Sequence, residues 1–226
     1  LEKENGTYQD TYAISTPLLA KAWEQQDMSE IRDLYTKSSI NQLIVGGVFF
    51  LCVWLNIDNV FALLPEKFQQ GKWVVFYIGL SQLVNISCGL NGAIIVNSKY
   101  YRYDLYTNIL LVFITIGTNY LLIPIFGING AAMATAMSLL LFNMLRLVII
   151  KSKMNMQPFS LSTLKTIILL LLIFIIMNML PQFIHPFFDL ILKSILVLVL
   201  FIPLVISLNL SNDISEIFKE IKSKIF

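Results

Sequence analysis

The sequence predicts an all-α membrane protein with six transmembrane helices, and two observations lead to this prediction. Of the 226 residues, 57% are hydrophobic and only 13% are charged, whereas a soluble domain carries roughly 25% charged residues. The few charges are also unevenly spread and leave long stretches uncharged. A soluble single domain of this length cannot bury so much apolar surface. This composition also argues against a disordered chain, a disulfide scaffold and a nucleic-acid binder.

Charge-free windows mark the expected membrane helices. Four windows contain 19 to 26 residues each, which matches the ~20 residues that a helix needs to cross ~30 Å of hydrocarbon. The fifth window, 105–145, has 41 residues and contains Pro124, Gly127 and Asn129-Gly130. Because Pro removes a backbone donor, and Gly and Asn-Gly favour turns, we predict two helices joined by a tight hairpin there. The six predicted helices are 40–58, 73–97, 105–124, 129–149, 166–185 and 193–210.

The basic residues predict the orientation of these helices. Six crossings place both ends of the chain on the same side of the membrane. Of the 16 Lys and Arg residues, Lys67, Lys72 and Lys193 fall on the other side, which leaves 16 − 3 = 13 on the side of the two ends. Since cytoplasmic loops carry the excess of positive charge, both ends are expected in the cytoplasm.

Two segments outside the predicted spans have the pattern of amphipathic helices. In the first, Asp27 and Glu30 follow a polar break at 24–26 in a capping-box-like arrangement, and Ile31 and Tyr35 lie on one apolar face. The tail repeats this pattern, with Asp213 and Glu216 at its start and isoleucines at 214, 217, 221 and 225. We predict that both segments lie on the cytoplasmic membrane surface, with ordinary solvated helices as the alternative.

The chain therefore divides into four predicted parts. A connecting segment (1–38) precedes a four-helix core (39–150), which is followed by two further spans (151–210) and the tail (211–226). The two further spans are runs of Leu, Ile, Phe and Val. We expect them to face lipid around most of their circumference.

Residues suited to catalysis are scarce in the predicted spans. The single histidine, His185, sits at a membrane edge and is interpreted as an interfacial residue rather than a catalyst. The spans contain no paired carboxylates, no H-E-x-x-H motif, no Cys/His cluster and no Gly-rich phosphate loop. Cys52 and Cys88 lie in apolar runs and are interpreted as buried hydrophobes. We predict no catalytic residue, no metal and no cofactor, so the protein is not expected to be an enzyme.

Amides and hydroxyls are the polar groups that the spans do carry. On the second predicted helix Gln82 and Asn85 lie close to one face, and on the third Asn108, Thr115 and Asn119 share a face at spacings i, i+7 and i+11. These faces are either packing surfaces with interhelical hydrogen bonds or the lining of a water-filled path for a polar solute. On the fourth helix, small residues predict an edge of close helix packing, namely Gly130, Ala134 and Ser138.

Charged residues near such a path are few. Lys99 and Arg102 lie in the stretch Lys99-Tyr-Tyr-Arg-Tyr-Asp104, where the second and third helices meet the cytoplasm. They are candidates for contact with phosphate, and the alternative is interfacial anchoring together with the tyrosines. Asp58 ends the first helix on the outer side and is either a proton or cation site or a simple helix-end charge.

Three stretches of the chain carry a recognisable pattern. They are Ser15-Thr-Pro-Leu-Leu-Ala-Lys-Ala-Trp-Glu24 with Tyr35-Thr-Lys-Ser-Ser39, Gly89-Leu-Asn-Gly-Ala-Ile-Ile-Val-Asn-Ser98 with Tyr101-Arg-Tyr-Asp104, and Asn119-Tyr-Leu-Leu-Ile-Pro-Ile-Phe-Gly-Ile-Asn-Gly-Ala-Ala132. Together they resemble the Wzx-type O-antigen and capsule flippases, polysaccharide biosynthesis proteins of the multidrug/oligosaccharidyl-lipid/polysaccharide exporter superfamily. The resemblance covers roughly residues 12–160, and the last two helices match only in number and hydrophobicity.

The resemblance implies a flippase of the bacterial cytoplasmic (inner) membrane. Its substrate would be an undecaprenyl-diphosphate-linked oligosaccharide, such as an O-antigen unit of lipopolysaccharide or a capsule unit, moved to the outer leaflet by alternating access. About 14 helices would form two lobes, and this chain would be the C-terminal lobe. Because Leu1 is not an initiating Met, we expect a fragment whose partners are the missing N-terminal lobe, membrane lipids and the lipid-linked substrate, and no nucleic acid.

Within this resemblance the polar residues acquire expected roles. The substrate path would be lined by Asn85, Asn108, Asn119, Thr115 and Gln82. Since no Lys or Arg lies deep inside a predicted span, basic cavity residues must come from the missing lobe, or Lys99 and Arg102 must serve at the mouth. The alternatives are a multidrug or small-solute exporter of the same superfamily, a membrane-embedded enzyme of glycan assembly, and a non-transporting scaffold.

Overall fold

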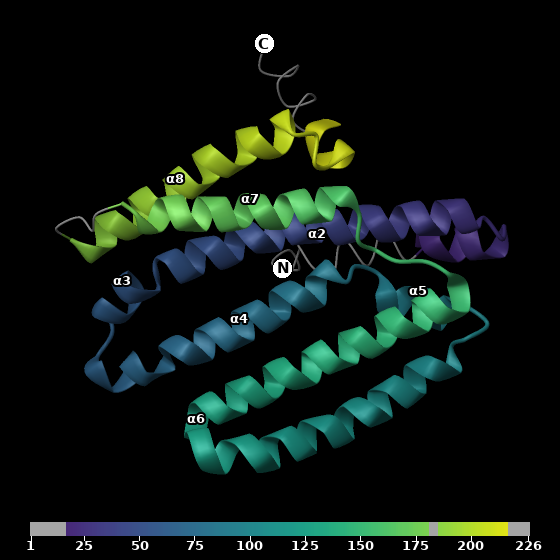
Figure 1. Cartoon of the computed structure of the whole chain (residues 1–226), viewed down its shortest axis with the longest axis horizontal. Coiled ribbons are helices and arrows are strands. Elements are labelled where there is room, and N and C mark those ends of the chain that lie inside the picture. The colour runs from purple at the N-terminus through teal and green to yellow at the C-terminus, as the bar shows by residue number, and fades with distance from the viewer. Residues whose placement is uncertain (1–16, 181–184, 217–226) are drawn as a thin grey trace, which may run out of the picture.

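The computed structural model describes residues 17–180 and 185–216, and these residues form helices and connecting turns without any β-strand (Figure 1). The prediction of an all-α chain is therefore confirmed for this part of the protein. The elements are α2 (Met28–Leu55), α3 (Ile57–Ala62), the 3-10 helix η1 (Glu66–Gly71), α4 (Lys72–Ser87), α5 (Asn91–Asn97), α6 (Arg102–Met154), α7 (Leu161–Asn178) and α8 (Pro186–Ser207). Short helical segments at 17–24 and 212–216 flank them.

Several of these helices are long and apolar enough to cross a membrane. By length and composition α2, α6, α7 and α8 each qualify, and α4 with α5 forms a fifth candidate that bends by 45° at its break. The structure thus supports a membrane-spanning chain. The predicted count of six is not reached by this criterion, because α6 counts once although it is folded on itself.

α6 is a helical hairpin. A straight helix of its 53 residues would be ~80 Å long at 1.5 Å per residue, far more than one bilayer. The backbone leaves the helical conformation at Gly127 (φ 57°, ψ −131°), and the two limbs run back side by side (Figure 1). Thr118 Oγ1 on the first limb lies 3.0 Å from Ser138 Oγ on the second. At Gly130 a Cβ would lie 2.1 Å from the carbonyl oxygen of Leu122. The hairpin predicted in this window is therefore present, and the small-residue edge lets its limbs approach.

α4 and α5 do not form the single helix that was predicted for 73–97. The break lies at Gly89, whose φ of +59° is left-handed. A Cβ at Gly89 would lie 2.7 Å from Ser38 Oγ and 3.0 Å from the backbone nitrogen of Ser39. The Ser39 hydroxyl donates to the carbonyl of Ser87 at 2.5 Å and satisfies the end of α4. The span is broken because the backbones of α2 and α4 approach too closely here for any side chain.

α2 begins twelve residues before the first predicted span, since it starts at Met28 rather than at 40. Asp27 caps it, and Asp27 Oδ1 accepts hydrogen bonds from the backbone N–H groups of Ser29 and Glu30 at 3.0 Å. The Ser29 hydroxyl and then the Glu30 N–H hold the pKa of Asp27 below its usual value. The predicted helix start is confirmed. However, the connecting helix and the first span are one continuous element, so the predicted boundary at 38 falls inside α2.

The helices pack around two separate apolar cores. The first joins α2, α7 and α8, and it consists of Ile40, Leu43, Ile44, Leu51, Leu169, Leu170, Ile173, Met177, Val197, Phe201, Val205 and Leu210. The second joins the segment 17–24, the start of α2, α5 and the end of α6, and it consists of Leu19, Ala22, Ile31, Tyr35, Leu90, Ile94, Ile95, Ile150 and Met156. Protein, rather than a membrane surface, therefore covers the apolar face that was predicted around Ile31 and Tyr35. α7 and α8 each bury one stripe and leave most other side chains exposed.

The boundaries of the last two helices also differ from the prediction. α7 starts at Leu161, where Ser160 and Thr163 form a capping box, and α8 starts at Pro186 rather than at 193. His185 caps α8, its Nδ1 accepting from the Phe187 N–H at 3.3 Å. Lys193 thus lies in the second turn of α8 and not in a loop. Part of the predicted helix 166–185 and the tail beyond 216 lie outside the described residues.

Candidate functional site

A buried amide joins the helices α4, α5 and α6. Asn143, on the second limb of α6, is 2% exposed. Its Oδ1 accepts from Asn91 Nδ2 of α5 at 2.9 Å, and its Nδ2 donates to Asn85 Oδ1 of α4 at 2.9 Å. The same Nδ2 also donates to the Leu139 carbonyl one turn back, at 2.9 Å. These three residues form an amide chain, Asn91–Asn143–Asn85, that fixes the broken span against α6.

On one side the amide chain leads to a groove between α2 and α4. Asn85 Nδ2 lies 3.5 Å from Gln82 Oε1, at the outer limit of a hydrogen bond. Gln82, with Asn41 and Gln42 of α2, supplies the polar part of the lining of this groove, whose volume is about 640 Å³. Within the described part of the chain, no donor reaches the buried Oε1 of Gln42. The groove wall therefore carries three amide side chains, of which Gln82 is exposed.

A second, smaller groove adjoins the first. It has a volume of about 320 Å³, and all its lining residues are apolar side chains or glycine from α2, α4 and α7. Phe50 and Leu83 belong to the linings of both grooves. The first groove, whose otherwise apolar lining carries the three amides Asn41, Gln42 and Gln82, is called the amide-bearing groove below, and it shares one partition with the apolar groove.

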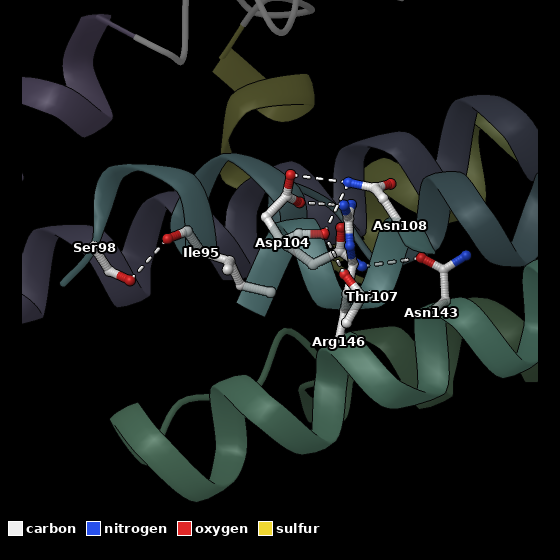
Figure 2. A network of polar contacts seen from close by, with 8 residues as sticks. Ile95, Ser98, Asp104, Thr107, Asn108, Asn143 and Arg146 are labelled. Atoms are coloured by element: carbon white, nitrogen blue, oxygen red, sulfur yellow. Dashed lines mark hydrogen bonds and ion pairs between the residues drawn. The ribbon is translucent and has the colours of Figure 1, made fainter. Parts of the chain in front are cut away.

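On the other side the amide chain is followed by an ion pair. Arg146, three residues after Asn143, pairs with Asp104 at the start of the first limb of α6 (Figure 2). Asp104 Oδ2 also accepts from Asn108 Nδ2 at 3.0 Å. The Arg146 guanidinium lies 4.1 Å from the ring centroid of Phe142, and a Cβ at Gly92 of α5 would lie 2.7 Å from Arg146 Nη1. The pair clamps the open end of the hairpin and packs against α5.

The structure brings only some of the predicted site residues together. Asn85 belongs to the amide chain, Gln82 lines the groove, and Asn108 supports the ion pair. Asn119 Nδ2 instead donates to the carbonyl of Thr115 at 2.7 Å, within its own limb. These last two residues make no hydrogen bond to the amide chain, so the third predicted helix does not present one continuous polar face to it.

The predicted phosphate contacts lie on the connection between α5 and α6 and at the start of α6. Lys99 and Arg102 are both exposed. Lys99 Nζ lies 5.3 Å from the ring centroid of Tyr100, and the Arg102 guanidinium lies 5.9 Å from that of Tyr101. Both cations therefore stand over neighbouring tyrosines, which is the arrangement of the interfacial alternative, and both stay accessible to an anion.

Sequence reasoning missed the residues at the centre of the site. Asn143 and Asn91 were assigned no role, and Arg146 was counted among the cytoplasmic loop charges. The structure places Arg146 within α6, eight residues before the helix ends at Met154. The sequence did contain a signal. Asn143 and Arg146 are three residues apart and so share a helix face. The predicted hairpin also brings the end of its second helix back beside Asp104, at the start of its first helix.

A second buried polar cluster, also missed, lies where α3 meets α8. Asp189 and Lys193 form an ion pair of 2.8 Å within α8, and Asn59 Nδ2 of α3 donates to Asp189 Oδ2 at 2.5 Å. Asp58, the predicted candidate for a cation site, is instead exposed and pairs with Lys72 at 2.5 Å. Among the described residues, no group of three or more His, Cys, Asp or Glu side chains is placed to hold a metal.

Comparison with known proteins adds no family to this geometry. No protein-family model matches the chain, and no curated protein or solved structure does. The function is therefore argued from the site itself.

Proposed function

We propose that this chain is one lobe of a membrane transporter that moves a lipid-linked oligosaccharide, carried on undecaprenyl diphosphate, across the bacterial cytoplasmic membrane. The observation that carries the proposal is the pair of adjoining grooves beside α2 and α4. A lipid-linked sugar needs donors and acceptors for its headgroup and an apolar surface for its tail. The amide-bearing groove supplies amide side chains within a mostly apolar lining, and the apolar groove adjoins it, with Phe50 and Leu83 between them.

The side chains of the amide-bearing groove suit sugar hydroxyls. An amide side chain donates through its nitrogen and accepts through its oxygen, and a hydroxyl group does both as well. Gln82 is exposed and Gln42 Oε1 has no donor among the described residues. We assign the exposed Gln82 to headgroup contact, and Asn85, held by Asn143, to the support of Gln82.

The topology that goes with this proposal has six crossings. They are α2, the bent pair α4 and α5, the two limbs of α6, α7 and α8. An even number puts both ends on one side, and the excess of Lys and Arg there makes that side the cytoplasm. Lys99 and Arg102 then stand at the cytoplasmic mouth, where an arriving diphosphate would meet them.

A second lobe completes the route in this proposal. Transporters built from repeats form their site at the interface between the two halves. The amide-bearing groove is open on one side, so a single lobe encloses the headgroup only in part. We place the missing N-terminal lobe against this open side.

The test uses the full-length protein in proteoliposomes containing a fluorescent polyprenyl-diphosphate oligosaccharide. Leaflet transfer is followed by the loss of the label to a membrane-impermeant quencher. Gln82→Leu is expected to slow transfer about fivefold, because one hydrogen bond to the substrate is worth ~1 kcal/mol. Asn178→Leu is the matched control, since Asn178 is an exposed amide on α7 whose hydrogen bond among the described residues goes to the Phe174 carbonyl of its own helix.

The outcomes separate the proposed function from its rivals. Transfer without covalent change to the lipid supports a flippase. The proposal is contradicted if the protein transfers no lipid-linked oligosaccharide, or if it changes the covalent structure of that lipid-linked oligosaccharide. Equal loss of transfer in Asn178→Leu and Gln82→Leu would remove the groove from the substrate route.

A further inference from the structure

The first two turns of α8 carry a buried ion pair. The Asp189 side chain is 1% exposed and the Lys193 side chain 8%, and they lie one turn apart at 2.8 Å. The carboxylate is also held from a second helix, because Asn59 Nδ2 of α3 donates to Asp189 Oδ2 at 2.5 Å. Beside them Asn56 Nδ2, at the end of α2, donates to Ser194 Oγ at 3.1 Å. Three helices therefore meet around one carboxylate.

Such a pair is not explained by stability. Removing two charges from water is expensive, and apolar residues of similar volume often replace a buried ion pair without loss of stability. α8 is among the helices apolar enough to cross a membrane. Ionisable residues inside such helices are rare and mark pathways for ions, protons or substrates.

Few other ionisable groups face this pair. On α8, His185 stands one turn before Asp189 and is exposed. On α3, Asp58 is exposed and paired with Lys72 of α4. α2 carries no charged residue after Lys37, and the only one on α7 is Lys165. Among the described residues, Lys193 is the charged group that pairs with Asp189.

We propose that Asp189 is the proton-binding residue that couples transport to a proton gradient, with Lys193 as its internal counter-ion; this rests on the proposed function. With Asp189 ionised, Lys193 and Asn59 both hold its carboxylate, and α8 stays docked on α3. A proton on Asp189 removes the negative charge and leaves the Lys193 ammonium buried without compensation. Hydration of that ammonium then requires α8 to separate from α3, so protonation favours the state that is open at this end.

The contacts favour a proton over a metal cation. The position beside Asp189 Oδ2 that a sodium ion would occupy already holds the Lys193 ammonium. Asn59 presents its Nδ2, a donor, to the same oxygen, whereas a metal ion would require oxygen ligands. A proton needs no further ligand.

The test measures accumulation by the full-length protein in proteoliposomes. With the membrane potential held at zero, a pH difference of one unit is imposed, and the steady-state ratio of the fluorescent lipid-linked oligosaccharide between leaflets is read. One proton per lipid gives a ratio of up to about tenfold for the wild-type protein, since one pH unit corresponds to 1.36 kcal/mol. Asp189→Asn keeps a partner for Asn59 and is expected to bring the ratio to about one while transfer between leaflets continues.

Two further variants make the result specific. Asp189→Asn with Lys193→Met leaves no uncompensated charge, which guards against misfolding, and is expected to show the same ratio of about one. Asp58→Asn with Lys72→Met removes the exposed pair at the same end of the molecule and is expected to keep the wild-type ratio.

The outcomes distinguish this inference from the function on which it rests. A double variant, Asp189→Asn with Lys193→Met, that accumulates lipid as the wild-type protein does would overturn the inference. So would a wild-type protein that transfers lipid without any response to pH, or that responds to a sodium gradient instead. A wild-type protein that transfers no lipid would overturn the proposed function and this inference with it.

Discussion

Each end of the helix bundle holds an ion pair whose side chains are at least three-quarters buried, and these two pairs lie in different surroundings. At the end where α5 meets α6, Arg146 and Asp104 have side chains that are 13% and 24% exposed. At the opposite end, where α3 meets α8 (Figure 1), Lys193 and Asp189 are 8% and 1% exposed. The side chains of the first pair can therefore reach water as soon as the pair opens, whereas those of the second pair can do so only if the surrounding helices separate.

The pairs also differ in what they connect. Arg146 and Asp104 are 42 residues apart and join two limbs of a hairpin. Lys193 and Asp189 lie one turn apart on a single helix, and the link to α3 is made by a neutral amide, Asn59. A guanidinium that stacks on Phe142 suits a fixed clamp, whereas an ammonium on a flexible stem suits a contact that opens. The two pairs therefore differ in burial, in the kind of cation and in the elements that they join, and we assign release to the Asp189–Lys193 pair alone.

The largest effect is expected from breaking the buried pair. Lys193→Met leaves the Asp189 carboxylate buried without its counter-ion, which costs about 3–5 kcal/mol of the free energy of unfolding. Adding Asp189→Asn is expected to restore most of that loss. Both are measured by denaturant unfolding of the full-length protein in detergent, followed by tryptophan fluorescence. A loss below about 1 kcal/mol in the single variant would show that water already reaches Asp189.

An intermediate effect is expected at the hairpin clamp. Arg146→Leu leaves Asp104 able to rehydrate, so the loss lies between that of an exposed and that of a buried pair, at about 1–2 kcal/mol. The charge exchange Asp104→Arg with Arg146→Asp is the control and is expected to recover part of the stability. If the exchange is no more stable than Arg146→Leu, the packing of the guanidinium on Phe142 matters more than its charge.

The smallest effect is expected at the exposed pair of Asp58 and Lys72, whose side chains are 63% and 33% exposed. Asp58→Asn is expected to change the free energy of unfolding by less than about 0.5 kcal/mol, and high salt is expected to remove even that difference. A larger, salt-resistant loss would place this pair with the buried one and weaken the distinction between the two ends.

The sequence predicted the elements that local chemistry decides. The hairpin follows from Pro124 and Gly127, and the start of α2 follows from the capping side chain of Asp27. In both cases neighbouring residues determine the backbone. The break at Gly89 was not predictable in this way, since its cause is the approach of Ser38 and Ser39 from another helix.

The charged residues show a more general reason for the errors. A charge-free window ends at the first charge, as if every charge lay outside the membrane helix. Asp104 and Arg146 bound one window, and Asp189 and Lys193 bound the two windows on either side of them. In the structure Asp104 pairs with Arg146, and Asp189 pairs with Lys193. All four residues lie within helices. Pairing is a tertiary property, so a count along the chain cannot detect it.

The hairpin of α6 has a consequence for how the chain is synthesised. Its limbs satisfy each other's polar groups, Thr118 with Ser138 and Asp104 with Arg146. We therefore expect the two limbs to enter lipid as a unit during synthesis. Asn59 precedes Asp189 along the chain, so the amide partner on α3 is made before the charged turn of α8. The order of translation thus matches the order in which these helices need one another.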